Sequence, residues 1–326
     1  MPTEMVTRAK LIEMKWARLS GNTPRETYWA EVADALFCAE SIAGLLSNGI
    51  EVRINSEGLL LDWTAPLSGE RLVFELDPGD IRTFPPTLVA EGDYEPVLSS
   101  LLFSLVQLSR AFVDVGANVG FYTVSALKMM QGVQVVSFEP NPIVFSKLKK
   151  NLSLNDCRQS ADIRNLAVSN VTSGSVDFFV PKLTGSGGGS MSNLHPEEGE
   201  PVVQIVSTTT LDKELENFVE VDVIKVDVEG SELKVIQGGI QTIRDHSPTI
   251  VIELLRKWME PFGDHPQDVV SLLKDEGYEV YAINELGCEL ISEITTDTVA
   301  TNFVFCHWSR LEHLEEIKTR ISATGS

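Results

Sequence analysis

The chain has 326 residues, 43% of them hydrophobic and 22% charged, enough to bury one substantial α/β core and carry an appended element. Its 47 acidic residues outnumber 26 lysines and arginines, and the formal net charge of -21 opposes binding to a phosphate backbone. The 4 cysteines include no CxxC pair, and no stretch approaches the roughly 20 apolar residues of a membrane span. We therefore expect a cytoplasmic protein that binds neither nucleic acid nor a membrane.

The first part of the chain predicts one helix followed by a small β element. Apolar residues recur every 3.6 residues over Arg25–Ser47, and Asn48-Gly49 then supplies a stop. Three short alternating runs separated by turn residues predict antiparallel strands at Glu51–Asn55, Leu59–Trp63 and Leu72–Leu76. A second helix is predicted over Val97–Leu108.

Beyond Ser109, short β-branched runs alternate with amphipathic helices, which predicts a doubly wound α/β fold with a mostly parallel sheet. The seven predicted strands are Ala111–Val115, Val133–Phe138, Ala161–Val168, Asp222–Asp227, Thr249–Leu254, Tyr278–Ile283 and Asn302–Cys306. Between the third and the fourth, Ser175–Pro181 and Val202–Val206 flank a glycine-rich stretch, Gly185–Gly189. This arrangement predicts a hairpin-like insertion with a mobile connector or lid.

A glycine-containing turn, Asp114–Gly120, joins the first of these strands to a helix that starts near Phe121. Backbone N–H groups and a helix N-terminus then converge at the carboxyl edge of the sheet, which predicts a cofactor pocket. The spacing is not the GxGxxG of dinucleotide binding, because Asn118 and Phe121 replace the second and third glycines. The acid Asp114 also suits a positively charged ammonium and sulfonium better than a pyrophosphate. A nicotinamide-dependent oxidoreductase and an ordinary strand-to-helix turn stay as alternatives.

Further acids follow the second and fourth strands. Glu139 comes about 20 residues after the first glycine, the spacing expected of a contact to ribose hydroxyls, although an acid near a helix N-terminus is the alternative. Asp227 and Glu229 emerge where the fourth strand ends and have the same side-chain parity, so both are candidates to face a cofactor or an acceptor. Glu232 is expected to cap the next helix. A divalent metal is less well supported, since no histidine sits at ligand spacing.

With these residues assembled, the chain resembles the FkbM family of methyltransferases over roughly Glu91 to Ile283. The strings that carry the resemblance are EGDYEP, FVDVGANVGFYT, VSFEPNP, KLKKNLSLN, TTTLDK, VIKVDVEGSELKVIQGG, TIVIE and LLKDEGYEV. The resemblance implies a class I methyltransferase fold, Rossmann-like, with a seven-stranded sheet whose last strand is antiparallel. It also implies transfer of a methyl group from S-adenosylmethionine, commonly to oxygen. We expect an extension over residues 1–90, a methyltransferase domain over 91–310 and a C-terminal helix or tail over 311–326.

The same resemblance implies a cofactor site in which Glu139 holds the ribose and Ala167 and Val168 border the adenine. Tyr94 and Glu95 match a family signature and either fold over the cofactor or pack. The residues expected at the cofactor are Tyr94, Glu95, Asp114, Gly116, Asn118, Gly120, Glu139, Asn141, Ala167 and Asp227.

An alcohol acceptor must lose its proton as it attacks the methyl group, so the reaction requires a base or a metal-held alkoxide. The candidate catalytic residues are His195, His265, Asp227, Glu229 and Glu253. His195 follows the glycine-rich loop and His265 follows the fifth strand, and for each an exposed loop residue is the alternative. We expect a small-molecule or glycan acceptor, and a non-catalytic S-adenosylmethionine-binding module is the third hypothesis. The sequence leaves both the acceptor and a homo-oligomeric state open.

Overall fold

A computed structural model of the chain describes residues 50–55, 58–65, 68–76, 88, 94–130, 132–172, 174–182, 188–285 and 287–320. The predicted helix Arg25–Ser47 and most of the loop Gly185–Gly189 lie outside the described residues. Among the helices in these ranges, none combines the length and the apolar character that crossing a membrane demands.

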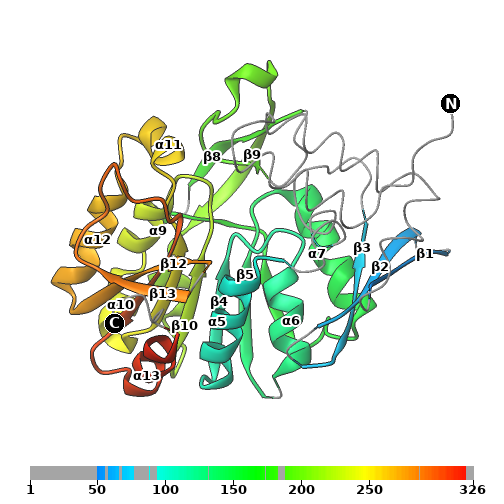
Figure 1. Cartoon of the computed structure of the whole chain (residues 1–326). Coiled ribbons are helices and arrows are strands. Elements are labelled where there is room, and N and C mark those ends of the chain that lie inside the picture. The colour runs from blue at the N-terminus through cyan, green and yellow to red at the C-terminus, as the bar shows by residue number, and fades with distance from the viewer. Residues whose placement is uncertain are drawn as a thin grey trace, which may run out of the picture.

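A mixed eight-stranded sheet forms the centre of the molecule (Figure 1), in the order β13-β12-β14-β11-β10-β4-β5-β6. Its strands are β4 (Ala111–Val115), β5 (Gln134–Phe138), β6 (Ala161–Arg164), β10 (Val223–Val226), β11 (Thr249–Glu253), β12 (Tyr278–Asn284), β13 (Gly287–Ile291) and β14 (Asn302–His307). The strands from β6 to β11 run parallel, and β14 is antiparallel to both β11 and β12. The chain winds outward in both directions from β4, so the carboxyl ends of β4, β5 and β10 mark the usual ligand crevice of a doubly wound sheet.

Helices cover both faces of the sheet, which confirms the doubly wound prediction. One core contains Phe112, Val135 and residues of α5 (Pro96–Gln107), α6 (Phe121–Met129), α7 (Pro142–Leu154) and α13 (Leu311–Thr319). The other contains Val113, Val136 and residues of α8 (Leu211–Leu215), α9 (Glu232–Gln237), α10 (Ile240–His246) and α12 (Pro266–Asp275). Successive strand residues point to opposite faces, so the nearly continuous apolar strands supply both cores. The short α11 (Arg256–Met259) follows β11.

Two strand predictions were wrong in detail. The third predicted strand, Ala161–Val168, is divided into β6 and β7 (Ala167–Val168), which pair in different sheets. The division falls at Asn165, whose side-chain amide donates to the carbonyls of Glu139 and Pro140 at 2.7 and 2.9 Å and so turns the chain where β5 ends. The structure also adds β13, an antiparallel partner of β12 that was not predicted, so the sheet has eight strands and not seven.

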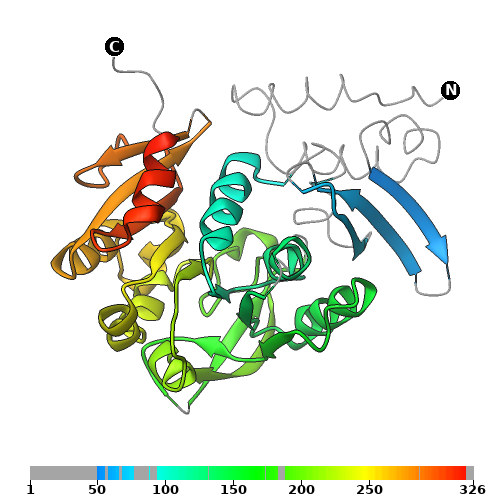
Figure 2. The same cartoon turned by 90° about the horizontal axis from the view of Figure 1, so that it is seen from below.

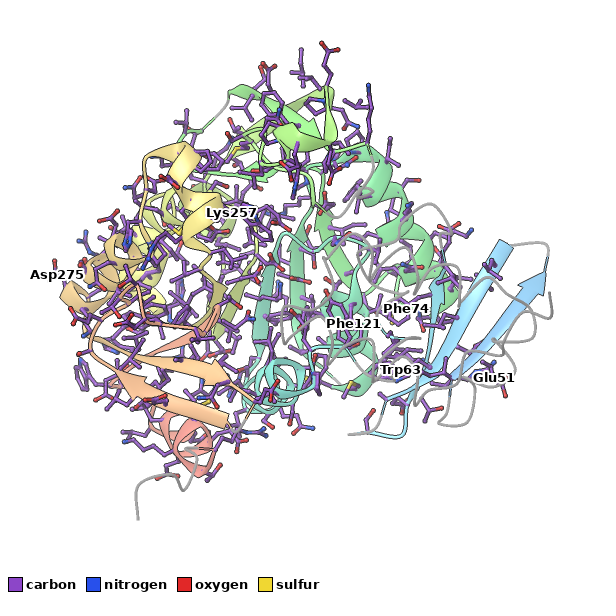
Figure 3. The ribbon with its side chains drawn as sticks, turned by 45° about the horizontal axis from the view of Figure 1, so that its top comes forward. Glu51, Trp63, Phe74, Phe121, Lys257 and Asp275 are labelled. Carbon is purple, nitrogen blue, oxygen red and sulfur yellow. The ribbon has the colours of Figure 1, made fainter. Side chains whose placement is uncertain are left out.

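The predicted small β element is confirmed as the antiparallel sheet β1 (Ile50–Asn55), β2 (Gly58–Thr64) and β3 (Arg71–Glu75). Figure 2 shows it on the side of the molecule occupied by α6 and α7, away from β12 and β13. Its aromatic residues pack on the start of α6, with ring centroids of Trp63 and Phe74 at 5.6 and 6.1 Å from that of Phe121 (Figure 3). The sheet therefore shares a core with the helices beneath the glycine turn.

Side chains of α7 and its C-cap residue take the place of a strand beside β3. The Oδ1 atoms of Asn155 and Asn151 accept from the backbone N–H groups of Val73 and Glu75, each at 2.8 Å. The Nδ2 atom of Asn155 donates in turn to the carbonyl of Val73 at 2.6 Å. Both asparagines are buried, so these bonds fix the distance between the small sheet and α7.

The predicted insertion is confirmed as a hairpin of β8 (Ser175–Val180) and β9 (Val202–Thr209). The far end of β9 pairs in parallel with β7, which joins the hairpin to the domain. Figure 1 shows β8 and β9 projecting beyond the main sheet, and the segment between them includes η2 (Pro196–Glu198).

Candidate active site

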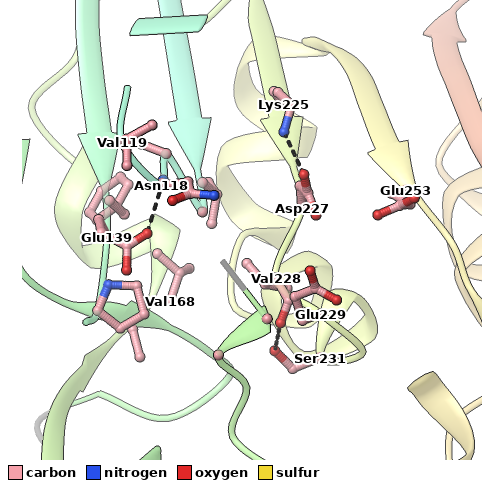
Figure 4. A pocket seen from close by; sticks show the side chains of 18 of the residues that line it. Asn118, Val119, Glu139, Val168, Lys225, Asp227, Val228, Glu229, Ser231 and Glu253 are labelled. Carbon is pink, nitrogen blue, oxygen red and sulfur yellow. Dashed lines mark hydrogen bonds and ion pairs between the residues drawn. The ribbon is translucent and has the colours of Figure 1, made fainter. Parts of the chain in front are cut away.

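A pocket lies at the carboxyl ends of β4, β5, β10 and β11, and the hairpin forms its outer wall. The lining residues are 94–95, 115–119, 121–122, 138–140, 166–168, 188–189 and 227–229 together with Phe178, Met191, His195, Lys225, Ser231, Glu253 and Trp258. Figure 4 shows Asn118 and Glu139 on one wall, and Lys225, Asp227 and Glu253 facing them from β10 and β11. The predicted cofactor turn and the predicted acids thus meet in one place.

The turn after β4 is tied to the end of β5 by its own backbone. The N–H groups of Gly116 and Ala117 both donate to the carbonyl of Phe138 at 2.9 Å, and the N–H of Asn118 donates to Oε2 of Glu139 at 2.9 Å. These donors were expected to converge on a ligand, but the structure uses them to hold the turn against β5. Gly120 is the N-cap of α6 and does not line the pocket.

Gly116 is required at its position for two reasons. Its φ of 83° lies in the left-handed region, and a Cβ there would collide with the backbone carbonyl of Asp227 at the end of β10. The ends of β4 and β10 therefore approach each other as closely as a glycine allows.

We expect Gly116→Ala to lower the free energy of unfolding by more than about 3 kcal/mol, because backbone strain and a backbone collision add. Urea denaturation measures the change. Gly132→Ala is the matched control, since Gly132 has a φ of 85° and nothing within 4 Å of an added Cβ. Its expected cost is only about 1 kcal/mol, the strain alone. Equal costs at the two positions would contradict the close approach of the turn to β10.

Glu139 is a buried carboxylate with both oxygens oriented by backbone donors. Its Oε1 accepts from the N–H of Asn141 at 2.8 Å, and its Oε2 accepts from that of Asn118. Burial raises the pKa of Glu139 to about 7, although these two hydrogen bonds lower it in part. Each carboxylate oxygen can accept a second hydrogen bond, so the group can still bind a pair of hydroxyls.

The two asparagines of the predicted cofactor site differ in their roles. Asn118 lines the pocket with a φ of 52°, and within the described part of the chain its buried Oδ1 has no hydrogen-bond partner. Asn141 instead caps α7 by accepting from the N–H of Ile143 at 3.0 Å, and it does not line the pocket. Of these two asparagines, only Asn118 presents a side-chain acceptor to a ligand.

Lys225 is a charged residue of the pocket lining that the sequence analysis did not single out. It is 4% exposed, its Nζ lies 3.0 Å from Oδ2 of Asp227, and the same atom lies 4.8 Å from the ring centroid of Tyr122. Burial by itself lowers the pKa of Lys225, but Asp227, Asp114 and Glu95 outweigh burial and raise it. The ammonium is therefore a permanent cation among carboxylates. The sequence feature that could have identified Lys225 is a charged residue inside the otherwise apolar strand β10.

Asp114 lies behind this cation and not in the pocket. It is 0% exposed, and its Oδ2 accepts from the Thr123 hydroxyl at 2.7 Å. Burial raises the pKa of Asp114, while Lys225 and the Thr123 hydroxyl lower it. Asp114 therefore interacts with Lys225 and with Thr123 of α6, whereas the sequence predicted a direct contact with the cofactor.

Glu95 and Tyr94, the residues before α5, both line the pocket. Oε2 of Glu95 accepts from the hydroxyl of Tyr122 at 2.6 Å. Burial raises the pKa of Glu95, and Lys225 and Tyr122 lower it in part. Burial likewise raises the pKa of Tyr94, followed by the charges of nearby carboxylates.

The other predicted catalytic acids also reach the pocket. Glu253 lines it from the end of β11, and burial, followed by the charges of Asp227 and Glu95, raises its pKa well above the usual range. Glu229 lines it with a φ of 56°, and its backbone carbonyl accepts from the Ser190 hydroxyl at 2.6 Å. Ala167 and Val168 line the opposite end, beside β5.

The two candidate histidines are separated by the structure. His195 lines the pocket from the hairpin side and is 8% exposed. His265 does not line it, because its Nδ1 accepts from the N–H of Gln267 at 3.0 Å and so caps α12, while its Nε2 lies 3.0 Å from Nε of Arg256. Of the pair, only His195 is placed to meet a ligand.

His195 also belongs to a group of metal-ligating side chains at the pocket rim. Its Nδ1 lies 3.4 Å from Oε1 of Glu197 and 3.9 Å from Oε1 of Glu198. In the described ranges, this is the one group of three or more such residues whose ligand atoms all lie within 4.8 Å of one another. The acids around Lys225 do not form such a group.

The model of one protein family, described as Methyltransferase FkbM domain, matches residues 114–280, about half of the chain. The chain is 27% identical over 224 residues to Methyltransferase sdnD of Sordaria araneosa, covering 59% of this chain and 83% of that protein. It is 28% identical over 162 residues to Hexuronic acid methyltransferase AglP of Haloferax volcanii, covering 50% of this chain and 60% of that protein. Among solved structures, Methyltransferase FkbM from Methylobacillus flagellatus is 17% identical with a TM-score of 0.40, over 68% of this chain and 52% of that one.

Proposed function

We propose, because this chain belongs to the FkbM methyltransferase family, that it transfers the methyl group of S-adenosylmethionine to a hydroxyl oxygen of a small molecule or glycan. Membership makes the chain a methyltransferase and sets aside the nicotinamide-dependent oxidoreductase. Transfer to oxygen is supported by acidic residues in the pocket lining, because a hydroxyl acceptor must give up its proton to a base. These residues are Glu95, Asp227, Glu229 and Glu253.

The pocket residues fit S-adenosylmethionine on two observations. The unpartnered Oδ1 of Asn118 is an acceptor for a ligand donor, and the oriented carboxylate of Glu139 can accept from the two ribose hydroxyls. Bound S-adenosylmethionine supplies an electrophilic methyl group on a positively charged sulfur. Around Lys225 the carboxyl groups of Asp227, Asp114 and Glu95 outnumber the single ammonium, an arrangement that favours a sulfonium.

The remaining tasks of the protein are alignment and exclusion of water. Methyl transfer is an in-line displacement, so a correctly held acceptor supplies much of the rate enhancement. Phe178, Met191 and Trp258 contribute apolar residues to the lining of the pocket. The family relative named as a hexuronic acid methyltransferase supports a sugar-like acceptor.

A screen of hydroxylated acceptors by mass spectrometry tests this proposal. The purified chain, S-adenosylmethionine and a panel of sugars, glycans and phenols should yield a methyl-mass gain on at least one hydroxyl compound. Methylation confined to amines or carboxylates would contradict hydroxyl transfer. Tight cofactor binding by calorimetry with no product from any acceptor would instead favour the non-catalytic module.

We expect turnover to survive removal of divalent metal, because the acidic cluster already contains its own cation. Lys225 is held 3.0 Å from Asp227 and stands among the carboxylates that a metal would otherwise bridge. Turnover after dialysis against EDTA should stay within about twofold of the untreated enzyme, with magnesium added back as the control. A loss of turnover that magnesium reverses would mean that a metal binds the acceptor hydroxyl. Loss of the magnesium effect in His195→Ala would then place that metal at the pocket rim, beside Glu197 and Glu198.

A further inference from the structure

Glu95 has a backbone conformation that its residue type does not favour. It is one of 5 non-glycine residues with positive φ in the described ranges, and 3 of these, Glu95, Asn118 and Glu229, line the pocket. With φ at 45°, Glu95 carries a cost of roughly 1–3 kcal/mol that the surrounding structure must offset. Strained residues of this kind concentrate at functional sites, which makes a functional role for the Glu95 side chain a hypothesis to test.

Several contacts fix this conformation. Pro96 is the first residue of α5, the N–H of Ser99 donates to the carbonyl of Glu95 at 2.8 Å, and the Ser99 hydroxyl donates to the carbonyl of Tyr94 at 2.7 Å. The Tyr122 hydroxyl then holds Oε2 of Glu95. The carboxylate is thus set at a defined position in the pocket wall before any ligand binds.

The second oxygen of this carboxylate is available to a ligand. Oε1 of Glu95 forms no hydrogen bond with any residue that the structure describes, and the side chain lines the pocket. The charged and titratable groups around it are Lys225 and Asp227 from β10, Glu253 from β11, Tyr122 from α6 and the neighbouring Tyr94. Lys225 is the cation of this set.

Three other pocket carboxyls are less suited to accept a proton, and Glu229 is the competing candidate. Asp227 is paired with the buried Lys225 at 3.0 Å, and taking up a proton would break that ion pair. Burial, followed by the charges of Asp227 and Glu95, raises the pKa of Glu253 well above its usual range, which favours its neutral form. Glu139 accepts one backbone hydrogen bond at each oxygen, and its remaining capacity is assigned to the ribose hydroxyls. For Glu95, burial raises the pKa while Lys225 and Tyr122 limit the rise, so the carboxylate is a stronger base than an exposed one.

We propose that Glu95 is the catalytic base that removes the proton of the acceptor hydroxyl, with Tyr122 as its positioning residue. The acceptor oxygen forms a bond to the methyl carbon while the carbon–sulfur bond breaks and leaves its electron pair on sulfur. The hydroxyl proton passes to Oε1 of Glu95, which returns it to solvent once the product leaves. This role rests on the proposed hydroxyl transfer and differs from the cofactor contact that the sequence predicts for Glu95.

Glu95→Gln tests the role, because it keeps an oxygen for Tyr122 and removes the basic oxygen. With the acceptor that gives the largest methyl-mass gain in the screen, kcat at saturating cofactor should fall about 100-fold or more. Calorimetry with S-adenosylhomocysteine, which needs no acceptor, should give an affinity within about threefold of wild type. Asp156→Asn is the matched control, since Asp156 is an acid with a φ of 59° outside the pocket, and kcat should not change.

The pH profile separates a base from a merely structural residue. Wild-type kcat should rise as pH passes through the pKa of Glu95, because only the carboxylate accepts a proton, and Glu95→Gln should lack this inflection. Tyr122→Phe should move the inflection to higher pH, since the carboxylate loses a hydrogen bond that favours its ionised form.

Two results would overturn the assignment. One is a Glu95→Gln enzyme with kcat within about threefold of wild type, in which case Glu229→Gln is the next variant to lose activity. The other is loss of S-adenosylhomocysteine affinity by about 30-fold or more in Glu95→Gln, which would make Glu95 a cofactor ligand. Failure of the acceptor screen is a different result, because it removes hydroxyl transfer itself and leaves the affinity comparison intact.

Discussion

Replacing Glu139 with alanine is expected to weaken S-adenosylmethionine binding by about 100-fold or more, as measured by calorimetry. Hydrogen bonds to a charged group contribute about 1.5–3 kcal/mol each, and the change removes the acceptor of two ribose hydroxyls. It also releases the N–H groups of Asn118 and Asn141, which Glu139 holds at 2.9 and 2.8 Å. The loss therefore includes part of the shape of the glycine turn.

Wild-type affinity should in addition depend on pH in a defined direction. Burial raises the pKa of Glu139 to about 7, and the ribose hydroxyls donate to the ionised form. Protonation competes with the ligand, so affinity should decrease as pH falls through about 7 and level off above about 8. The dependence should disappear in Glu139→Ala.

The matched control for this variant is Glu232→Ala. Glu232 is also buried, its Oε1 accepts from the N–H of Gly230 at 2.9 Å, and burial raises its pKa to about 7, but it does not line the pocket. We expect its loss to reduce stability while affinity changes by less than about tenfold. Full affinity in Glu139→Ala would remove the ribose assignment.

Lys225→Met is expected to lower the free energy of unfolding by about 3–5 kcal/mol near pH 8, because it leaves buried carboxylates without their cation. The folded-state pKa of Lys225 is raised, so its contribution is fully present below the unfolded-state pKa and is lost only as pH rises through the folded one. Across the neutral range, the wild-type lysine therefore stays charged. In the variant the loss should shrink as pH falls, since Asp114 and Glu95 then take up protons.

Urea denaturation at about pH 6 and about pH 8 measures this difference. Lys150→Met is the matched control, because Lys150 pairs with Glu75 at 2.7 Å but is 34% exposed, and such pairs contribute only about 1 kcal/mol or less. Lys225→Arg keeps the charge and should lose less than Lys225→Met. Equal losses at the two lysines would mean that Lys225 is not the cation on which the acidic cluster depends.

The fold could be predicted where local pattern and tertiary context agree. The strand Ala111–Val115 was predicted with its observed bounds, because a short, mostly apolar run that ends at a glycine turn favours a buried strand. The break at Asn165 could not be predicted, because it depends on carbonyls that only the end of β5 supplies. The strand β13 lacks a clear alternation, and its pairing with β12 alone makes it a strand.

The site shows the same division. Glycines and acids at strand ends signal their position directly, so Gly116, Glu139 and Asp227 were placed at the pocket that the structure contains. Lys225 was not predicted because its place in the site depends on charged neighbours from distant segments, including Glu95 and Asp114. His265 follows the correct strand but faces a helix terminus, and sequence spacing does not distinguish the two orientations.

Asn151 and Asn155, at the end of α7, oppose the aggregation of one copy of the chain with another through β3. An outer strand of an apolar sheet presents unpaired N–H and C=O groups, which is a template for strand addition and aggregation. Asn155 satisfies both groups of Val73, and Asn151 satisfies the N–H of Glu75. In the described ranges this sheet has three strands, and side chains from the end of α7 act as a stop against edge-to-edge growth at its β3 edge.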